Sequence, residues 1–450
     1  ISKSYIMHNG VLCVILMHKK YGQNSRRICP SRDSGYQQIS LEKEDLVFMR
    51  KHMHGVTQWQ VDSAWPGYTI FAPIMNTMKQ MEGRDHSYVY LLDMKGDIVH
   101  YWQIPGVIKH HGELLPNGHL LCSVNLKDVK NPLGLTFATS AIIELDWDSN
   151  VVWRYDDVYH DGHDRSRLSN GNTLYMRYKL LPEEKQRLVK GGEPGTEHNG
   201  QMFTLVLVEI TPDGQIVDEM DLSEALDPEV DVILPYSNRE LWPGLNSIEE
   251  MPDGKIISTS YNLSACYIWD RQNKTVAWRY GKGEQKISFP HDPHPLANGN
   301  ILLFDNGRDY APDPDGRTNY FPPDFSRVVE INPLTNETVW EYRAENPVDF
   351  YSTYISSCQR LPNDNTLICE GAIGRIFEVN RKGEIVWEYV SPFYTESGKR
   401  FGKTSAIFRA IRYSFDYSGL QPEAFRTDKC DKINRLYGSE AMRFANALRR

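Results

Sequence analysis

The stretch from Phe289 to Gly307 reads FPHDPHPLANGNILLFDNG, and it decides the fold. An Asn-Gly turn at residues 298–299 leads into the apolar run Ile301–Phe304, and a histidine stands five residues before Leu296. An Asn-Gly pair next to an apolar β-rich run is a strong hairpin signal. Related phrases begin at residues 115, 168, 251 and 361. The recurrence predicts one such hairpin in each of several repeats.

A second phrase alternates with the first. It is a short polar turn followed by a β-rich run, as in Val151–Tyr155 (VVWRY) and Glu384–Tyr389 (EIVWEY), and its six turns lie at residues 93–97, 146–150, 211–214, 270–274, 332–336 and 380–383. Two hairpins make four strands per repeat, and a spacing of about 50 to 65 residues is typical of a propeller blade with its loops. We therefore expect an all-β fold, a six-bladed β-propeller with N- and C-terminal extensions. A β-sandwich is the alternative.

The regular pattern sets the expected boundaries. Residues 1–60 show no period and form an N-terminal extension, part of which we expect to be disordered. Residues 61–415 form the propeller, which we expect to close by pairing N- and C-terminal strands in one blade. Residues 416–450 have helical composition and form a C-terminal tail. A short helix is expected at Glu183–Leu188, and Arg308–Asp324 is expected to be a long loop.

Composition excludes several classes of protein. The net charge of −9 over 450 residues argues against a general nucleic-acid or anionic-membrane binder. The seven cysteines include no C-x-x-C pair, so we expect scattered buried thiols rather than a zinc ribbon or a disulfide framework. The apolar run Val11–Met17 is far shorter than the roughly 20 residues that a membrane helix needs. No membrane span is therefore expected.

One offset in the repeat collects polar side chains. The residue five positions before each Asn-Gly phrase belongs to the innermost strand of a blade, and these residues are His110, His163, Asn246, His291 and Ser356. Three histidines at one structural offset predict a shared site at the propeller channel. Such a ring supplies a nucleophile with acid–base partners, or the ligands of one metal ion. Alternatively, each histidine only binds a neighbouring loop.

At this point the chain resembles a known family. It is similar to the bacterial arylsulfotransferases, six-bladed propellers that move a sulfuryl group between phenols, over roughly residues 65–415. The resemblance rests on the repeated Asn-Gly and Val-Trp phrases and on four further stretches: Trp242–Ser247 (WPGLNS), His291–Pro293 (HDP), Phe304–Gly307 (FDNG) and Phe408–Tyr413 (FRAIRY).

The resemblance implies a sulfotransferase mechanism. His291 is the expected nucleophile, which becomes sulfohistidine, and His163 and His110 are expected to act as acid–base or oxyanion partners. The resemblance also implies small-molecule substrates (an aryl sulfate and a phenol), no cofactor, no bound metal, and a periplasmic or secreted location. We expect substrate contacts from four residues: Asn246, Tyr261, Arg409 and Arg412.

Two positions depart from the family pattern. Gly244 stands where the family's W-x-H-x-N motif has histidine, and Tyr261 stands where the family has arginine. A cation near the transferred group stabilises its dispersed negative charge, so Arg308, Arg409 or Arg412 is expected to substitute. Asp292 or Asp305 is expected to fix the tautomer of His291.

Two other functions stay open. In the first, a divalent metal bound by His110, His163 and His291 supports lyase or hydrolase chemistry. Further ligands would come from His111, His160 and His294, and orienting carboxylates from Asp161, Asp164, Asp292 and Asp305. In the second, the propeller has lost catalysis and binds a ligand or a protein.

Overall fold

The computed structural model describes residues 2–8, 11–17, 53–74, 85–126, 129, 132–135, 138–139, 141–281, 287–308, 325–396, 403–425 and 428–447. The chain divides into two units, residues 1–53 and 54–450. In the first unit, β1 (Ser2–His8) pairs antiparallel with β2 (Val11–Met17).

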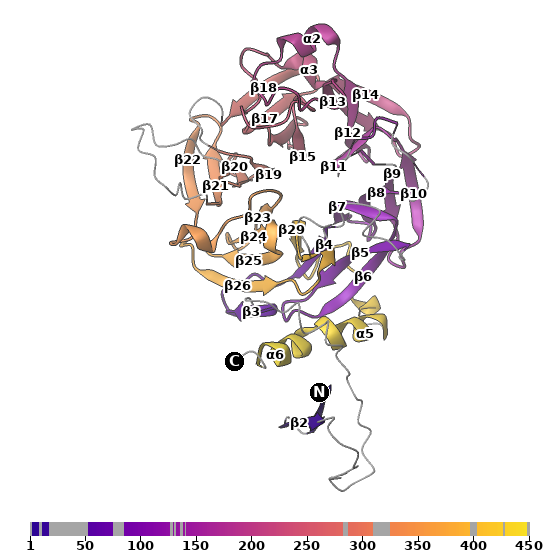
Figure 1. Ribbon diagram of the computed structural model, residues 1–450, viewed down its shortest axis with the longest axis vertical. Coiled ribbons are helices and arrows are strands. Elements are labelled where there is room, and N and C mark those ends of the chain that lie inside the picture. The colour runs from indigo at the N-terminus through magenta and orange to yellow at the C-terminus, as the bar shows by residue number, and fades with distance from the viewer. Residues whose placement is uncertain are drawn as a thin grey trace. The chain divides into compact units, whose positions relative to one another are not determined.

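The second unit is a ring of six antiparallel blades, here called A to F (Figure 1). The strands of each blade are given from the inside outward. Blade A contains β29 (Ile407–Tyr413), β4 (Tyr68–Pro73), β5 (His86–Leu92) and β6 (Ile98–Pro105), and blade B contains β7 (Val107–Leu114), β8 (Leu120–Asn125), β9 (Ala141–Leu145) and β10 (Val151–Asp156). Blade C contains β11 (His160–Arg167), β12 (Thr173–Leu180), β13 (Phe203–Ile210) and β14 (Ile216–Asp221). Blade D contains β15 (Leu245–Glu250), β16 (Ile256–Ser260), β17 (Ala265–Asp270) and β18 (Thr275–Tyr280). Blade E contains β19 (His291–Pro295), β20 (Ile301–Asp305), β21 (Arg327–Asn332) and β22 (Glu337–Tyr342). Blade F contains β23 (Ser357–Arg360), β24 (Thr366–Glu370), β25 (Arg375–Val379), β26 (Ile385–Val390) and β3 (Gly55–Trp59). The predicted six-bladed propeller is confirmed.

Ring closure explains why one phrase has six copies and the other has five. Each second-phrase turn joins the two outer strands of a blade, and each Asn-Gly phrase joins the two inner strands. In blade A the inner strands are β29 and β4, which come from opposite ends of the propeller and pair antiparallel. No turn joins them, so blade A has no Asn-Gly phrase.

The tryptophans of the second phrase connect neighbouring blades. The indole N–H of Trp387 donates to the Met94 carbonyl in the outer turn of the next blade, at 3.0 Å. Trp153, Trp278 and Trp340 make the equivalent bonds to Pro212, Asn336 and Arg381. A buried indole needs a hydrogen-bond acceptor as well as apolar contact. In four of the six copies of the phrase, the indole therefore joins one blade to the next.

The remaining elements lie outside the four-stranded pattern. β3 was expected within the extension, but it pairs with β26 and makes blade F five-stranded, so the first blade strand begins before residue 61. The helix α2 (Glu183–Leu188) is present as predicted, and the tail contains α5 (Asp428–Tyr437) and α6 (Ser439–Ala447). Short elements complete the unit: α3 (Leu222–Ala225), η2 (Pro347–Asp349), η3 (Gly371–Ile373), η4 (Pro422–Ala424), β27 (Thr395–Glu396) and β28 (Lys403–Thr404).

Other expectations can be compared with the described residues. The expected loop at Arg308–Asp324 lies outside them except for Arg308. Five cysteines are buried free thiols, as predicted: Cys122, Cys266, Cys358, Cys369 and Cys430. Within the described ranges, no helix has the length and apolar character needed to cross a membrane.

Candidate active site

The inner strands share an irregularity at the predicted offset. The pairing register shifts between Lys109 and Gly112 in β7, His160 and Arg165 in β11, Leu245 and Ser247 in β15, His291 and His294 in β19, and Ile407 and Ala410 in β29. A bulge bends its strand and redirects side chains. His110 (φ 61°) and Asp292 (φ 54°) adopt the left-handed conformation within these bulges. Consecutive residues can therefore both reach the propeller axis.

The first of these consecutive residues form what we call the histidine layer: His110, His163, His291 and Phe408. The rings of His110 and His163 stack with centroids 4.9 Å apart. Phe408 lies 4.3 Å from the His110 centroid and 6.1 Å from the His291 centroid. The structure therefore brings together the three histidines that the sequence singled out, from blades B, C and E. Phe408 joins them from blade A.

All three histidines use Nδ1 as a donor. His110 Nδ1 donates to the Gly162 carbonyl at 2.8 Å, and His163 Nδ1 donates to Asp161 Oδ1 at 2.6 Å. His291 Nδ1 lies 2.7 Å from Asn306 Oδ1 and 3.0 Å from the Phe289 carbonyl. Carbonyls and carboxylates only accept, so the proton of each neutral ring is on Nδ1. The lone pair is then on Nε2 in each ring.

Asn306 fixes the orientation of His291. Its Nδ2 donates to the Ser352 and Ile355 carbonyls at 2.7 and 2.9 Å, which turns Oδ1 toward the imidazole. The expectation that Asp292 or Asp305 fixes this tautomer is wrong: Asp305 accepts from the Ser288 amide and Arg327, and Asp292 from the Cys358 amide and His294. Burial lowers the pKa of His291 to about 4, against opposing hydrogen bonds to Asn306 and Phe289.

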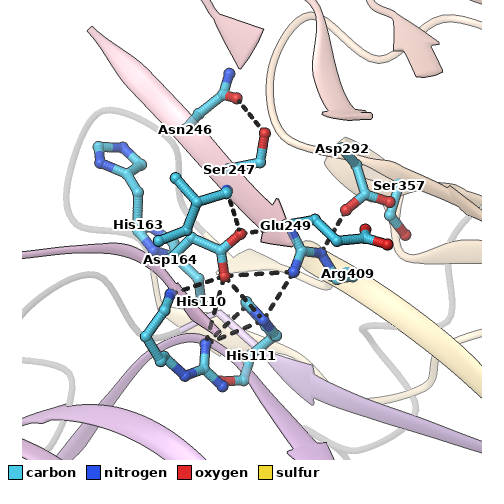
Figure 2. A network of polar contacts seen from close by, with 12 residues as sticks. His110, His111, His163, Asp164, Asn246, Ser247, Glu249, Asp292, Ser357 and Arg409 are labelled. Atoms are coloured by element: carbon cyan, nitrogen blue, oxygen red, sulfur yellow. Dashed lines mark hydrogen bonds and ion pairs between the residues drawn. The ribbon is translucent and has the colours of Figure 1, made fainter. Parts of the chain in front are cut away.

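One residue further along each inner strand, the side chains form what we call the Arg409 network (Figure 2): Arg409, His111, Asp164 and Asp292. Arg409 Nη2 donates to Asp164 Oδ2 at 3.0 Å, and its Nε lies 2.6 Å from Asp292 Oδ1. The amides of Ile248 and Cys358 donate to the two carboxylates, both at 3.0 Å. These partners come from all six blades, so the network holds the ring together at its axis.

Charge within the Arg409 network is balanced locally. Burial alone would lower the pKa of Arg409, but Asp164 and Asp292 hold it above its usual value. Burial would raise the pKa of Asp292, but Arg409 and His294 lower it to about 2. His111 Nε2 accepts from Arg409 and Arg165, both at 3.0 Å, and burial together with these cations lowers its pKa. The guanidinium of Arg409 is therefore neutralised by two carboxylates before any substrate arrives.

Three expected substrate contacts have other partners in the structure. Asn246 is buried; its Nδ2 donates to the Pro290 carbonyl at 2.8 Å and its Oδ1 accepts from Thr259, which positions the backbone entering His291. Arg412 is buried between blades, bonded to Glu378 and the Trp65 carbonyl and stacked on Trp387. It does not reach the histidine layer, so we correct that expectation. Arg409 belongs to the network described above.

The other histidines that we singled out are separate from the histidine layer. His160 bonds Ser123 and the Met176 carbonyl, and burial lowers its pKa to about 4. His294 pairs with Glu249 and, at 2.8 Å, with Asp292. Within the part of the chain that the structure describes, no group of three or more His, Cys, Asp or Glu side chains is arranged to hold a metal ion. The metal-dependent alternative therefore lacks a ligand set among these residues.

Gly244 and Tyr261 are in direct contact. A Cβ atom on Gly244 would lie 2.6 Å from Cε1 and 2.7 Å from Cζ of the Tyr261 ring, closer than van der Waals contact allows. The same ring lies 6.4 Å from the His163 ring, centroid to centroid. The Tyr261 phenol occupies the space that a side chain at position 244 would need. The two departures from the family pattern are therefore linked by this contact.

Sequence reasoning missed two residues of this site. Phe408 stands at the closing strand, where no Asn-Gly phrase marks the offset. Lys109 precedes His110, is buried, and has a pKa lowered to about 8 by burial, which Asp161 partly offsets. A lysine directly before His110 in an inner strand was the available signal.

The fold and this arrangement define a six-bladed propeller with a cluster of histidines at its axis. A family model described as "Arylsulfotransferase (ASST)" matches residues 111–392. The chain belongs to the arylsulfotransferase family.

No curated protein matches the chain significantly. Similar solved structures include a protein of unknown function from Bacteroides caccae (11% identity, TM-score 0.46, covering 77% of this chain and 98% of that one). Another is virginiamycin B lyase from Staphylococcus aureus (12% identity, TM-score 0.35, covering 70% and 85%). A third is a functionally unknown protein from Desulfotomaculum acetoxidans (10% identity, TM-score 0.42, covering 78% and 100%).

Proposed function

We propose that the protein transfers a sulfuryl group from an aryl sulfate to a phenolic acceptor, with His291 as the nucleophile. The observation that best supports this is the shared tautomer of the histidine layer, which leaves three Nε2 lone pairs near one another. A nucleophilic imidazole must be neutral, and a pKa of about 4 keeps His291 neutral at pH 7. Membership in the arylsulfotransferase family supports the sulfuryl group as the transferred group.

The reaction then has two balanced half-reactions. In the first, the Nε2 lone pair of His291 attacks sulfur, the bond between sulfur and the aryl oxygen breaks, and this oxygen leaves with the electron pair. This oxygen departs as a phenolate, while Asp161 accepts the Nδ1–H of His163 and so keeps the lone pair of that ring on Nε2. In the second, a phenol acceptor gives its proton to His163 Nε2 as its oxygen attacks the sulfur, and His163 then passes this proton to the released phenolate. The phenol ester forms and neutral His291 is restored.

Positive charge for the sulfuryl oxygens must come from groups outside the neutralised Arg409 network. Lys109 lies directly before His110 on β7, next to Asp161 in charge interaction. Arg308 lies over the Phe289 ring, with its Cζ 4.8 Å from the centroid, and Phe289 is two residues from His291. We assign the electrostatic role to these two residues.

The decisive experiment combines turnover with trapping. Purified protein is mixed with 4-nitrophenyl sulfate and a phenol acceptor, and nitrophenol release is followed. In a parallel sample without acceptor, peptide mapping locates a sulfuryl group. We expect acceptor-dependent turnover and modification of the His291 peptide. His119→Ala is the matched control, since His119 is a partly exposed residue paired with Glu144 away from the axis.

Three outcomes would contradict the proposal. No turnover with any aryl sulfate would favour a non-catalytic ligand-binding propeller. Turnover that a chelator abolishes and a divalent metal restores would favour the metal-dependent alternative. A sulfuryl group on a residue other than His291 would move the nucleophile. We further propose a periplasmic or secreted location, on family grounds, which fractionation of the native host would test.

A further inference from the structure

Tyr261 presents a phenol ring beside the proposed acid–base histidine, His163. It follows β16 directly, and its backbone amide donates to the Gly244 carbonyl at 3.0 Å, which fixes the turn over the start of the inner strand β15. The side chain is partly exposed. Its ring packs against the bare Gly244 and faces His163 from the neighbouring blade.

The Tyr261 hydroxyl is suited to be a donor rather than a base. Burial, with Asp161 and Glu240 nearby, raises the pKa of Tyr261 above its usual value, so its proton stays in place at every pH of interest. Among the described residues, the hydroxyl makes no hydrogen bond. A partly exposed phenol with its donor unused, next to the proposed acid–base histidine, indicates that a ligand oxygen is its partner.

We infer that the Tyr261 hydroxyl contacts the substrate and donates a hydrogen bond to the aryl oxygen as the bond from this oxygen to sulfur breaks. The inference rests on the proposed sulfuryl transfer and adds a catalytic residue to it. The hydrogen bond stabilises charge developing on the leaving oxygen. A neutral donor suits a phenolate, whose charge is partly spread into its ring.

Gly244 leaves the space that the Tyr261 ring occupies. Any side chain at position 244 would displace the Tyr261 ring, because the clash is with ring atoms. Glycine at this position thus places the hydroxyl. The two residues should be energetically coupled, and a double-mutant cycle measures such coupling.

The test is Tyr261→Phe, assayed with a series of aryl sulfates from good leaving groups, such as 4-nitrophenol, to poor ones, such as phenol. The hydrogen bond from Tyr261 forms while the sulfur–oxygen bond breaks. It should raise the rate most for the leaving groups whose phenolates are least stable. We expect kcat/KM to fall about 10- to 100-fold for phenyl sulfate, at or below the lower limit of the roughly 10²- to 10³-fold that losing one oxyanion-hole donor costs. The loss should be only a few-fold for nitrophenyl sulfate, so the dependence on leaving-group pKa becomes steeper.

The controls separate this role from a structural one. Tyr342→Phe removes a phenol oxygen from the blade E and F packing, away from the axis, and should leave the slope unchanged. Gly244→Ala should reproduce the steeper slope by moving the ring, and it should add no further loss in a Tyr261→Ala background. An equal loss for all substrates with Tyr261→Phe, or no loss, would overturn the inference while leaving sulfuryl transfer intact. Absence of turnover in the unaltered protein would overturn both.

Discussion

The histidine layer and the Arg409 network are built by neighbouring residues of the same inner strands, yet they differ in chemistry. In the histidine layer each imidazole Nδ1 donates to an oxygen, that of Gly162, Asp161 or Asn306, and Nε2 keeps its lone pair. In the Arg409 network the side chains bond one another across the axis, and their charges are neutralised. On each strand that carries a histidine of this layer, the histidine is available for chemistry, and the next residue along the strand helps to close the ring.

The difference teaches how a symmetric scaffold can hold an asymmetric site. Similar bulges in five of the six inner strands bring consecutive residues toward the axis, and the identity of those residues decides which layer reacts. Changes in the histidine layer should therefore affect activity more than stability. Changes in the Arg409 network should do the reverse.

Replacing His291 should have the largest effect. His291→Ala should abolish sulfuryl transfer because no covalent intermediate can form, and His291→Asn should not restore it because an amide is a poor nucleophile. The melting temperature should change little, since only the hydrogen bonds to Asn306 and Phe289 are lost. Turnover and thermal unfolding measured on the same preparations check this; residual activity near the original level would exclude His291 as the nucleophile.

The His163–Asp161 pair should come next. His163→Ala should slow turnover by about 10²- to 10⁴-fold, the usual contribution of an acid–base group. Asp161→Asn should also lower kcat strongly, by up to about 10⁴-fold, because an amide can present its NH₂ group to Nδ1 and favour the wrong tautomer. Steady-state kinetics with one aryl sulfate compares the two variants. An unchanged kcat in Asp161→Asn would contradict these roles.

Arg409→Leu should lower the stability of the protein more than its activity, the reverse of the histidine substitutions. It leaves Asp164 and Asp292 as buried carboxylates without their cation, and breaking a buried pair in this way costs about 3–5 kcal/mol of unfolding free energy. Denaturant unfolding measures the loss. Arg343→Leu is the matched control: Arg343 lies 3.5 Å from Glu341 at the surface, where such a pair contributes about 1 kcal/mol or less. Equal effects of the two substitutions would contradict the structural role of the network.

The acid limb of the pH profile should show the smallest and most specific effect. His291 reacts as a neutral ring, so activity falls when it gains a proton, and burial lowers its pKa to about 4. An unburied histidine would instead lose activity near pH 6.5. Because the unfolded chain binds protons at higher pH than buried His291, stability also declines as the pH drops from about 6.5 toward 4. Initial rates should therefore be paired with circular dichroism; a limb near pH 6.5 in folded protein would contradict the expectation.

Periodic features of the sequence predicted most of the fold. The two alternating phrases gave the blade count, and the shared offset identified His110, His163 and His291, because a repeat places equivalent residues at equivalent positions. The ring closure in blade A was expected, but not its residues. Phe408 has no local phrase to mark it, and its partners are more than 100 residues away in sequence.

The site was less predictable than the fold because hydrogen-bond partners cross between blades. The tautomer of His291 depends on Asn306, which is itself oriented by carbonyls of the following blade. Arg412 looked as suitable as Arg409 in sequence, but it lies three residues along β29 and pairs with Glu378 instead. The contact between Gly244 and Tyr261 joins two motifs that had been considered separately.

The position of β29 in blade A also has a consequence for how the protein is made. A ribosome delivers the other five inner strands first, and domains generally fold as units during or after their synthesis. Until residues 407–413 emerge, Asp164 and Asp292 lack their guanidinium, and His110 and His291 lack the aromatic ring that contacts them. Under the proposed function, a nascent or truncated chain therefore has an incomplete site, and activity begins only in molecules whose synthesis has passed the last strand of the ring.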